Sequence, residues 1–249
     1  MVVSLGETLC LLLLGHVVGD FYFQSDEMAI AKERSYAERV RHGVFYALGI
    51  APVLVAIAIF LGCPLVLAVG AWIVLSAMHG VIDFMIRPRI KRMTHGEVQA
   101  FLLDQALHVG CCVVAGVFLA KNASRELSPY WAETLVWTTS LALCIVPACV
   151  LVKLLLGSLR RDAAFPDGFR KDAANSGRAI GMLERAIVGV LTLLGQYDAI
   201  AFVVAAKSIA RYEKLKDDKT FAEVYLVGTL ASVATAIFLP LFVRWAMVL

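Results

Sequence analysis

Long apolar segments constrain the fold of this chain more than any other feature of its sequence. Gly43–Gly62, Thr134–Val152 and Val224–Val243 contain no charged residue, while Pro64–Ile86 and Glu97–Ala120 contain one or two. A helix needs about 20 mainly apolar residues to cross the hydrocarbon core of a bilayer. With 60% hydrophobic and 17% charged residues, the chain does not have the composition of a soluble domain. The sequence therefore predicts an all-α polytopic membrane helix bundle.

Three shorter segments decide how often the chain crosses the membrane: Leu5–Phe23, Ala179–Leu194 and Ala199–Ala210. The last two are joined by Gln196, Tyr197 and Asp198. They are interpreted either as two short spans or as a re-entrant hairpin. The prediction is therefore about eight spans, or about six spans plus a hairpin.

Basic residues cluster in alternate connections between the predicted spans. Four connections hold 17 Lys and Arg residues, whereas the opposite connections and the C-terminus hold three, Lys121, Arg125 and Arg244. By the positive-inside rule the basic connections face the cytoplasm, so both chain termini are predicted outside. The net charge of +3 is too small to suggest nucleic-acid binding. The expected partner is the lipid bilayer, and a homo-oligomer is compatible with the sequence.

The chain divides at its longest non-cytoplasmic connection, Asn122–Tyr130. We expect an N-terminal four-helix membrane module over residues 1–122 and C-terminal membrane helices over residues 131–249. Residues 157–178 are polar and contain proline and glycine, so a cytoplasmic loop is predicted there.

The same pair of ionisable residues recurs in three of the predicted helices. The pairs, each four residues apart, are His16 and Asp20, His79 and Asp83, and Asp104 and His108. Residues four apart share one face of a helix, so each helix presents an imidazole and a carboxylate together. The third pair is reversed in order, and its helix runs in the opposite direction. All three carboxylates are therefore predicted on the cytoplasmic side of a layer of imidazoles.

Ionisable residues inside a membrane cost about 2.5–3.5 kcal/mol each on insertion scales, so these six need partners, water or a metal. Mixed imidazole and carboxylate ligands suit zinc, manganese or iron better than calcium. The candidate ligands of a divalent metal cofactor are His16, His79, His108 and Asp104, and the candidate catalytic bases are Asp20 and Asp83. The alternative is a structural hydrogen-bonded network, but such a network does not require the same pair three times in one orientation.

Other polar residues are assigned supporting roles. Gln24 and Gln105 lie close to the pairs in the sequence. His42, at the cytoplasmic end of a span, either completes the mouth of the site or lies in the membrane interface, and the second is favoured. Glu184, Arg185 and Lys207 are interpreted as helix-pairing and interfacial residues, with an anion pocket formed by Arg185 and Lys207 as the less favoured alternative.

At these residues the chain resembles a family known as domain of unknown function 3307. The N-terminal motifs that carry the resemblance are His16–Asp20–Phe21–Gln24, His42, His79–Asp83 and Asp104–Gln105–His108. The C-terminal half is similar to longer members at Gly177–Arg178, Ile180–Gly181, Leu183–Glu184–Arg185, Ala206–Lys207–Ser208 and Gly228–Thr229. The resemblance implies a multi-pass protein of the bacterial cytoplasmic (inner) membrane and implies no activity. The His/Asp pairs are also similar, in residue type only, to those of membrane-bound metal-dependent hydrolases.

Three functions fit these features. The first is a metal-dependent hydrolase of an amphipathic substrate, such as a lipid or polyprenyl phosphate, that reaches the site from the inner leaflet. The second is a cation or metal transporter. Transport needs a polar route to the outer side, which the apolar run Gly62–Ser76 disfavours and Thr134–Ser140 would supply. The third is a non-catalytic membrane partner protein whose polar layer fixes helix register. The sequence leaves open whether the protein is an enzyme.

Overall fold

The computed structural model describes residues 4–162 and 171–249, which form helices and no strands. The chain divides into two compact units, one reaching Ala142 and including Val243–Leu249, the other comprising Leu143–Phe242. Among the described residues, six helices are long and apolar enough to cross a membrane, judged by length and composition. The predicted fold class, an all-α polytopic helix bundle, is confirmed.

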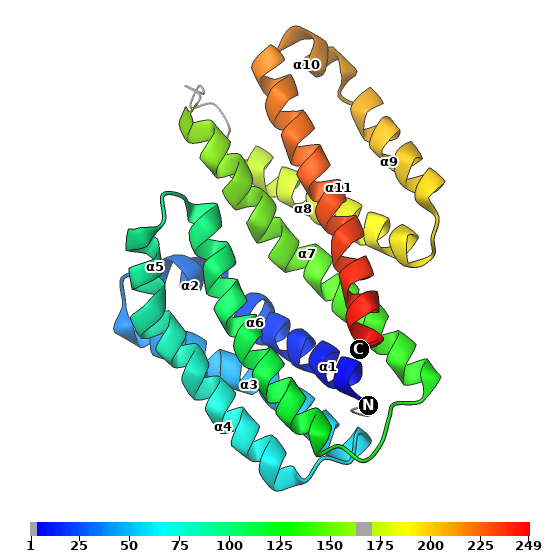
Figure 1. The fold of residues 1–249 in the computed structure, drawn as a ribbon. Helices are drawn as coiled ribbons and strands as arrows, with labels where there is room; N and C mark the ends of the chain where they lie inside the picture. Colours follow the sequence, from blue (N-terminus) through cyan, green and yellow to red (C-terminus); the bar gives the residue numbers. More distant parts are fainter. Residues whose placement is uncertain (1–3, 163–170) are drawn as a thin grey trace. The chain divides into compact units, whose positions relative to one another are not determined.

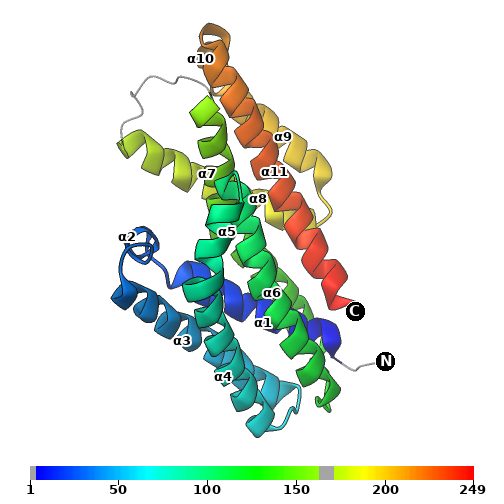
Figure 2. The same ribbon diagram turned by 60° about the vertical axis from the view of Figure 1, so that its left-hand side comes forward.

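The first unit is a bundle in which α1 and α4 each pack against both α3 and α6. Figures 1 and 2 show α3 and α4 side by side in blue to cyan, with α1 beside α6. The elements of this unit are α1 (Leu5–Val17), the π-helical turn η1 (Val18–Tyr22), α2 (Asp26–Ala31), α3 (Tyr36–Phe60), α4 (Leu65–Val81), the π-helical turn η2 (Ile82–Ile86), α5 (Arg87–Met93), α6 (Glu97–Lys121) and the first part of α7 (Pro129–Asp162).

The second unit contains a pair of packed helices, α8 and α9, joined at Gly195, whose φ of +70° favours glycine. Its elements after α7 are α8 (Lys171–Leu193), α9 (Tyr197–Ile209), α10 (Tyr212–Asp217) and most of α11 (Lys219–Met247). With 13 residues, α9 is too short for an ordinary span. Six helices of spanning length plus the α8–α9 pair, among the described residues, agree with the second form of the prediction.

The polar stretch 157–178 is helical at both of its described ends. Helix α7 continues to Asp162, and α8 begins at Lys171. The middle of the predicted loop, residues 163–170, lies outside the described residues.

One end of the first unit, which we call the closed end, contains the start of α1, the α3–α4 connection and the end of α6. Its core consists of apolar side chains at most 3% exposed, among them Leu12, Ile50, Leu54, Ile57, Leu61, Cys63, Cys112 and Leu119. The loop after α6 crosses this end and is held there by hydrogen bonds. The N–H groups of Ser124 and Arg125 donate to the Leu61 carbonyl at 3.0 and 3.1 Å, and that of Leu127 donates to the Glu7 carboxylate at 3.0 Å. We call the opposite end, with η1, α2, η2 and α5, the polar end.

Residues near both chain termini meet within the first unit. A Cβ atom added to Gly6 would lie 2.4 Å from the Met247 carbonyl oxygen, and the Cys10 thiol donates to the Val243 carbonyl at 3.9 Å. Both terminal segments therefore lie at the closed end, as an even number of spans requires. The predicted outward orientation of this end stays a prediction.

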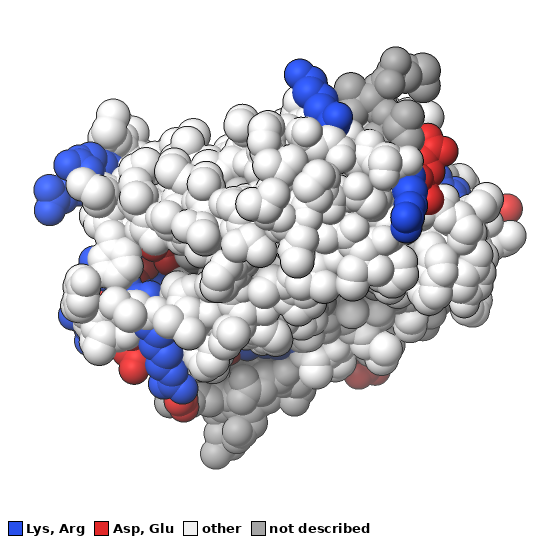
Figure 3. Space-filling model, turned by 90° about the horizontal axis from the view of Figure 1, so that it is seen from below, with Lys and Arg blue, Asp and Glu red and all other residues white. Residues whose placement is uncertain are grey.

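Large apolar side chains cover much of the molecular surface. On α3 alone, Val44, Leu48, Val55 and Ile59 are 48–60% exposed. The face in Figure 3 is largely uncharged, with Lys and Arg at its margins. Such a surface is unfavourable in water and compatible with a surrounding lipid bilayer.

The backbones of η1 and α3 approach closely because both carry glycine at the contact. A Cβ atom added to Gly49 would lie 2.5 Å from the Cα atom of Gly19, and one added to Gly19 would lie 3.0 Å from the Tyr46 carbonyl oxygen. Neither glycine has positive φ, so space rather than backbone conformation requires them. This approach brings Asp20, next to Gly19, within reach of α3.

We predict that Gly49→Ala destabilises the protein by about 1–3 kcal/mol, because its methyl group forces η1 away from α3. The matched control is Gly43→Ala on the same helix, where a Cβ atom meets nothing within 4 Å. The control should be neutral or stabilising by up to about 1 kcal/mol through helix propensity. Thermal unfolding in detergent measures both variants, and equal melting temperatures would contradict the close approach.

Candidate metal centre

His42 lies at the centre of a buried polar cluster at the polar end of the first unit. Its Nε2 atom is 3.1 Å from Asp20 Oδ1, 3.2 Å from His79 Nε2 and 3.5 Å from Asp83 Oδ2. The side chain is fully buried rather than interfacial, because η1 and α2 both pack against α3 at this point. His42 therefore connects the His/Asp pairs of α1 and α4, which its supporting role in the sequence-based assignment did not anticipate.

Asp20 and Asp83 lie in matching π-helical turns. Each turn follows the α-helix that carries the paired histidine, and the N–H groups of Phe23 and Arg87 bond to carbonyls five residues earlier. Within the pairs, His Nε2 lies 4.0 Å from the Asp20 carboxylate and 3.8 Å from that of Asp83. Such π-turns are rare and frequently occur at functional sites.

Gln105 determines which nitrogen of His16 carries the proton. Its amide nitrogen donates to Asp20 Oδ2 at 3.0 Å and to Asp104 Oδ2 at 3.4 Å. Ionised carboxylates only accept hydrogen bonds, so the amide oxygen faces His16 and accepts from its Nε2 at 3.1 Å. This assignment follows from the hydrogen-bond network. His16 Nε2 consequently carries a hydrogen and offers no lone pair to a metal.

The tautomer of His108 is set by its own helix. Nδ1 of His108 donates to the Asp104 carbonyl oxygen at 2.9 Å, because a carbonyl can only accept. In the neutral ring, Nε2 therefore carries the lone pair. That atom is buried and has no hydrogen-bond partner among the described residues. His108 is thus an available base or ligand.

Tyr46 holds the ring of His79 in place. The two rings are stacked with centroids 3.7 Å apart and planes at 4°. Tyr46 lies one helical turn after His42 on α3 and is 2% exposed. The same face of α3 therefore supplies one imidazole of the cluster and orients another.

Two basic side chains, Lys32 and Arg87, contact the carboxylates from the polar end. Lys32 Nζ is 3.5 Å from Asp83 Oδ2, and Arg87 is 3.6 Å from Asp83 Oδ1 and 3.9 Å from Asp104 Oδ2. Lys32 is 5% exposed. Both were predicted only as basic residues of cytoplasmic connections. A signal in the sequence existed for Arg87, which follows Asp83 by four residues, and not for Lys32.

An ion pair between Glu33 and Lys91 links the segments that carry these two cations. Partial burial raises the pKa of Glu33, but the bond from Lys91 and the charges of Arg87 and Lys32 outweigh it and hold this pKa below its ordinary value. Glu33 is therefore ionised and neutralises Lys91, so neither changes the charge balance of the cluster.

Within residues 4–162 and 171–249, two groups of buried side chains have ligand atoms close enough to hold a metal ion: Asp20, His42 and His79, and His79, Asp83 and His108. In a tetrahedral zinc site with bonds of 2.0–2.1 Å, neighbouring ligand atoms are about 3.3 Å apart. The distances from His42 Nε2 to Asp20, His79 and Asp83 lie within a few tenths of an ångström of this value, and His79 Nε2 lies 3.8 Å from Asp83 Oδ2. Asp83 itself belongs to the second group rather than the first. We call Asp20, His42, His79 and Asp83 the four-residue set.

Three other residues that the sequence predicted for the site, His16, Asp104 and Gln24, lie outside the four-residue set. Neither His16 nor Asp104 belongs to either metal-holding group among the described residues. Asp104 instead accepts from Gln105 and faces Arg87. The buried Oε1 atom of Gln24 has no hydrogen-bond partner in the described part of the chain.

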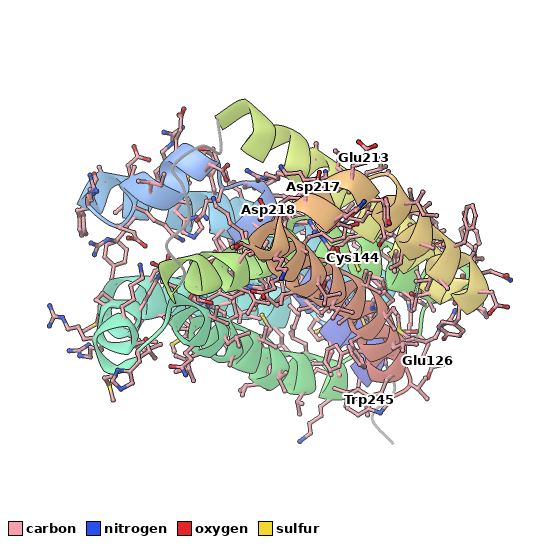
Figure 4. All side chains as sticks on the ribbon, turned by 90° about the horizontal axis from the view of Figure 1, so that it is seen from above. Glu126, Cys144, Glu213, Asp217, Asp218 and Trp245 are labelled. Carbon is pink, nitrogen blue, oxygen red and sulfur yellow. The ribbon has the colours of Figure 1, made fainter. Side chains whose placement is uncertain are left out.

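Glu184, Arg185 and Lys207 belong to the second unit. Arg185 is 3% exposed and donates to the carbonyls of Cys144 and Ile145 at 2.9 and 3.4 Å, close to Pro147 in α7. Cys144 is labelled in Figure 4. These hydrogen bonds join α8 to the backbone of α7. Glu184 and Lys207 pair at 2.5 Å. These contacts fit the favoured helix-pairing interpretation.

Comparison with known proteins identifies the family of this cluster. A family model described as Protein of unknown function (DUF3307) matches residues 8–135, just over half of the chain. The chain belongs to this family. The matched region contains every residue of the polar cluster, from His16 to His108. No curated protein and no solved structure matches the chain. Membership in DUF3307 brings no assigned activity, so function must be argued from the cluster itself.

In this DUF3307 protein, Gln105→Leu should destabilise the fold by about 1–3 kcal/mol, because it removes donors from two carboxylates and the acceptor of His16. Gln99→Leu is the matched control, since Gln99 is exposed on the same helix. Nitrogen NMR of labelled histidine would also report a change in the His16 tautomer. A Gln105→Leu variant with unchanged stability and tautomer would contradict the network.

Proposed function

We propose that the protein is a metal-dependent hydrolase with one divalent ion, zinc, manganese or iron, held by the four-residue set. The observation that carries this proposal is the convergence of three ligand-type atoms on His42 Nε2 at 3.1–3.5 Å. Buried imidazoles and carboxylates from separate helices are costly in an apolar protein unless they share a cation or each other's protons.

This proposal changes several sequence-based roles. Asp20 and Asp83, expected to be bases, become ligands because they lie beside His42 and His79. His16 leaves the ligand set because its Nε2 atom is a donor, and Asp104 leaves it because it faces Gln105 and Arg87. His108 becomes the candidate base, since its Nε2 lone pair is buried and unpartnered among the described residues.

A bound divalent metal would lower the pKa of a water molecule and polarise the oxygen of the bond to be cleaved. Side chains of the protein then transfer the proton that this water molecule releases. His108 Nε2 accepts it as the water oxygen bonds to the substrate, and returns it to the leaving oxygen as the old bond breaks. The Asp104 carbonyl keeps His108 in the tautomer that can do this.

Access to the cluster supports an amphipathic substrate entering from one side. The closed end is filled by apolar side chains and tied by the loop after α6. The polar end carries the Lys and Arg residues of the first unit that we expect in the cytoplasm of a bacterial inner membrane, with the termini outside. A substrate anchored in the inner leaflet would reach the cluster there.

Metal content tests the proposal directly. Purified wild-type protein should hold about one zinc, manganese or iron per chain, and His42→Ala and His79→Ala should lose most of it. His95→Ala is the matched control, because His95 is exposed in the α5–α6 connection. Elemental analysis measures the metal, and size-exclusion profiles confirm that the variants fold. Wild-type protein without metal after supplementation would overturn the proposal.

Metal transport, the competing function, makes a different prediction. Because Leu12, Ile57 and their neighbours fill the closed end, protein in sealed vesicles should bind metal without moving it across the bilayer. A metal-sensitive dye inside the vesicles measures entry. Continuous, protein-dependent accumulation that His79→Ala abolishes would contradict the hydrolase proposal and favour a carrier.

A further inference from the structure

Lys32 and Arg87 hold the same carboxylate from two sides. Lys32 Nζ contacts one oxygen of Asp83 at 3.5 Å, and Arg87 contacts the other at 3.6 Å. Burying a lysine to 5% exposure is costly unless an anion stays next to it. If Asp83 serves as a metal ligand, as proposed above, its charge is directed to the metal. Both cations then have donors to offer to another anion.

Metal binding reverses the sign of the cluster's charge. The carboxylates of Asp83 and Asp104 face the cations of Lys32 and Arg87, and Asp20 beside His42 adds a third carboxylate. Counted with neutral imidazoles, the cluster carries one net negative charge. A divalent metal makes this one net positive charge. Without the metal an incoming anion is repelled, and with it the anion is attracted.

The positions of the two cations indicate what kind of anion fits. Carboxylic esters and amides are uncharged at the group that is hydrolysed and do not need two additional cations there. A phosphoryl group is charged and presents several oxygens, which suit the planar fork of an arginine and the point charge of a lysine together. Arg87, with its side chain 27% exposed, is accessible to such a group from the polar end.

Exposed apolar side chains surround the cluster at the same level. Tyr22 and Phe23 follow Asp20, Met85 follows Asp83, and Leu102 and Leu103 precede Asp104, and these five side chains are 41–55% exposed. A lipid tail lying along this surface would place its headgroup beside Lys32 and Arg87. The cluster therefore combines two cations with an adjoining surface of exposed apolar side chains.

We propose that Lys32 and Arg87 form a phosphate-binding subsite beside the metal, and that the substrate is a lipid phosphate ester. This inference rests on the metal-dependent function proposed above. In the hydrolysis, a water oxygen bonds to phosphorus, the bond between phosphorus and the lipid oxygen breaks, and the proton from water passes to that oxygen. No other reactant is needed.

Equilibrium dialysis of radiolabelled inorganic phosphate tests the subsite. Detergent-purified protein is used metal-free and zinc-loaded, after free zinc has been removed, and zinc is measured in every sample. The variants are Lys32→Met and Arg87→Gln, with Arg89→Gln as the matched control. Arg89 lies on the same short helix, is exposed and donates to the Met85 carbonyl. A parallel series adds dioleoyl phosphatidic acid in mixed micelles as competitor, with phosphatidylcholine as its control.

We expect zinc-loaded wild type and Arg89→Gln to bind phosphate, and metal-free protein to bind it at least about tenfold more weakly. Arg87→Gln and Lys32→Met should retain zinc and lose about tenfold or more in phosphate affinity. Greater displacement of phosphate by phosphatidic acid than by the phosphatidylcholine control supports the lipid source. Displacement equal to that control overturns the lipid part.

The remaining outcomes separate the subsite from the metal proposal. Zinc-loaded wild type that binds no phosphate, or variants that bind it as tightly as Arg89→Gln, would overturn the subsite and leave the metal site standing. Equal phosphate binding with and without zinc would overturn the subsite too. A wild-type protein that takes up no zinc, manganese or iron would overturn both proposals.

Discussion

The structure depends on hydrogen bonds and ion pairs between ionisable side chains that are buried among apolar helices. Four imidazoles and three carboxylates are buried in the first unit, and each contacts another member of the polar cluster. A single unpaired charge there would cost more than most packing defects, so the cluster tolerates little change. The same requirement explains why Lys32 is withdrawn from solvent: it lies beside Asp83. A divalent ion would compensate the remaining negative charge. The same ion would therefore stabilise the cluster and supply its proposed chemistry.

Packing at a distance from the charges sets their geometry. Gly19 and Gly49 allow η1 to meet α3 backbone to backbone, and Asp20 follows Gly19 directly. The face of α3 that presents Gly49 also presents Tyr46 and His42 at successive turns. The stack of Tyr46 on His79 then orients the second imidazole toward the first. If η1 moved away from α3 by an ångström at the glycine contact, Asp20 would move with it. The four-residue set would then lose its geometry, because its ligand atoms must lie about 3.3 Å apart.

Local patterns predicted much of this, and contacts between distant segments account for what they did not. The repeated spacing of His and Asp four residues apart identified three of the helices that meet in the cluster and the six buried residues that they bring to it. It did not distinguish an α-helix from a π-turn, because both place residues four apart near each other. His42 was underestimated because it has no hydrogen-bond partner on its own helix; its partners, Asp20 and His79, come from η1 and α4. Lys32 was treated as a loop charge because nothing in its neighbourhood predicts that α2 folds back onto the cluster.

X-ray absorption spectroscopy of the zinc-loaded protein tests the central claim most directly, because it counts the imidazole and oxygen ligands around the ion. The four-residue set predicts two imidazoles and two oxygen ligands at about 2.0–2.1 Å in the wild type. It predicts one imidazole fewer after His42→Ala, whatever residual zinc that variant retains. A wild-type spectrum with no imidazole scattering, or one unchanged by the loss of His42, would contradict the account.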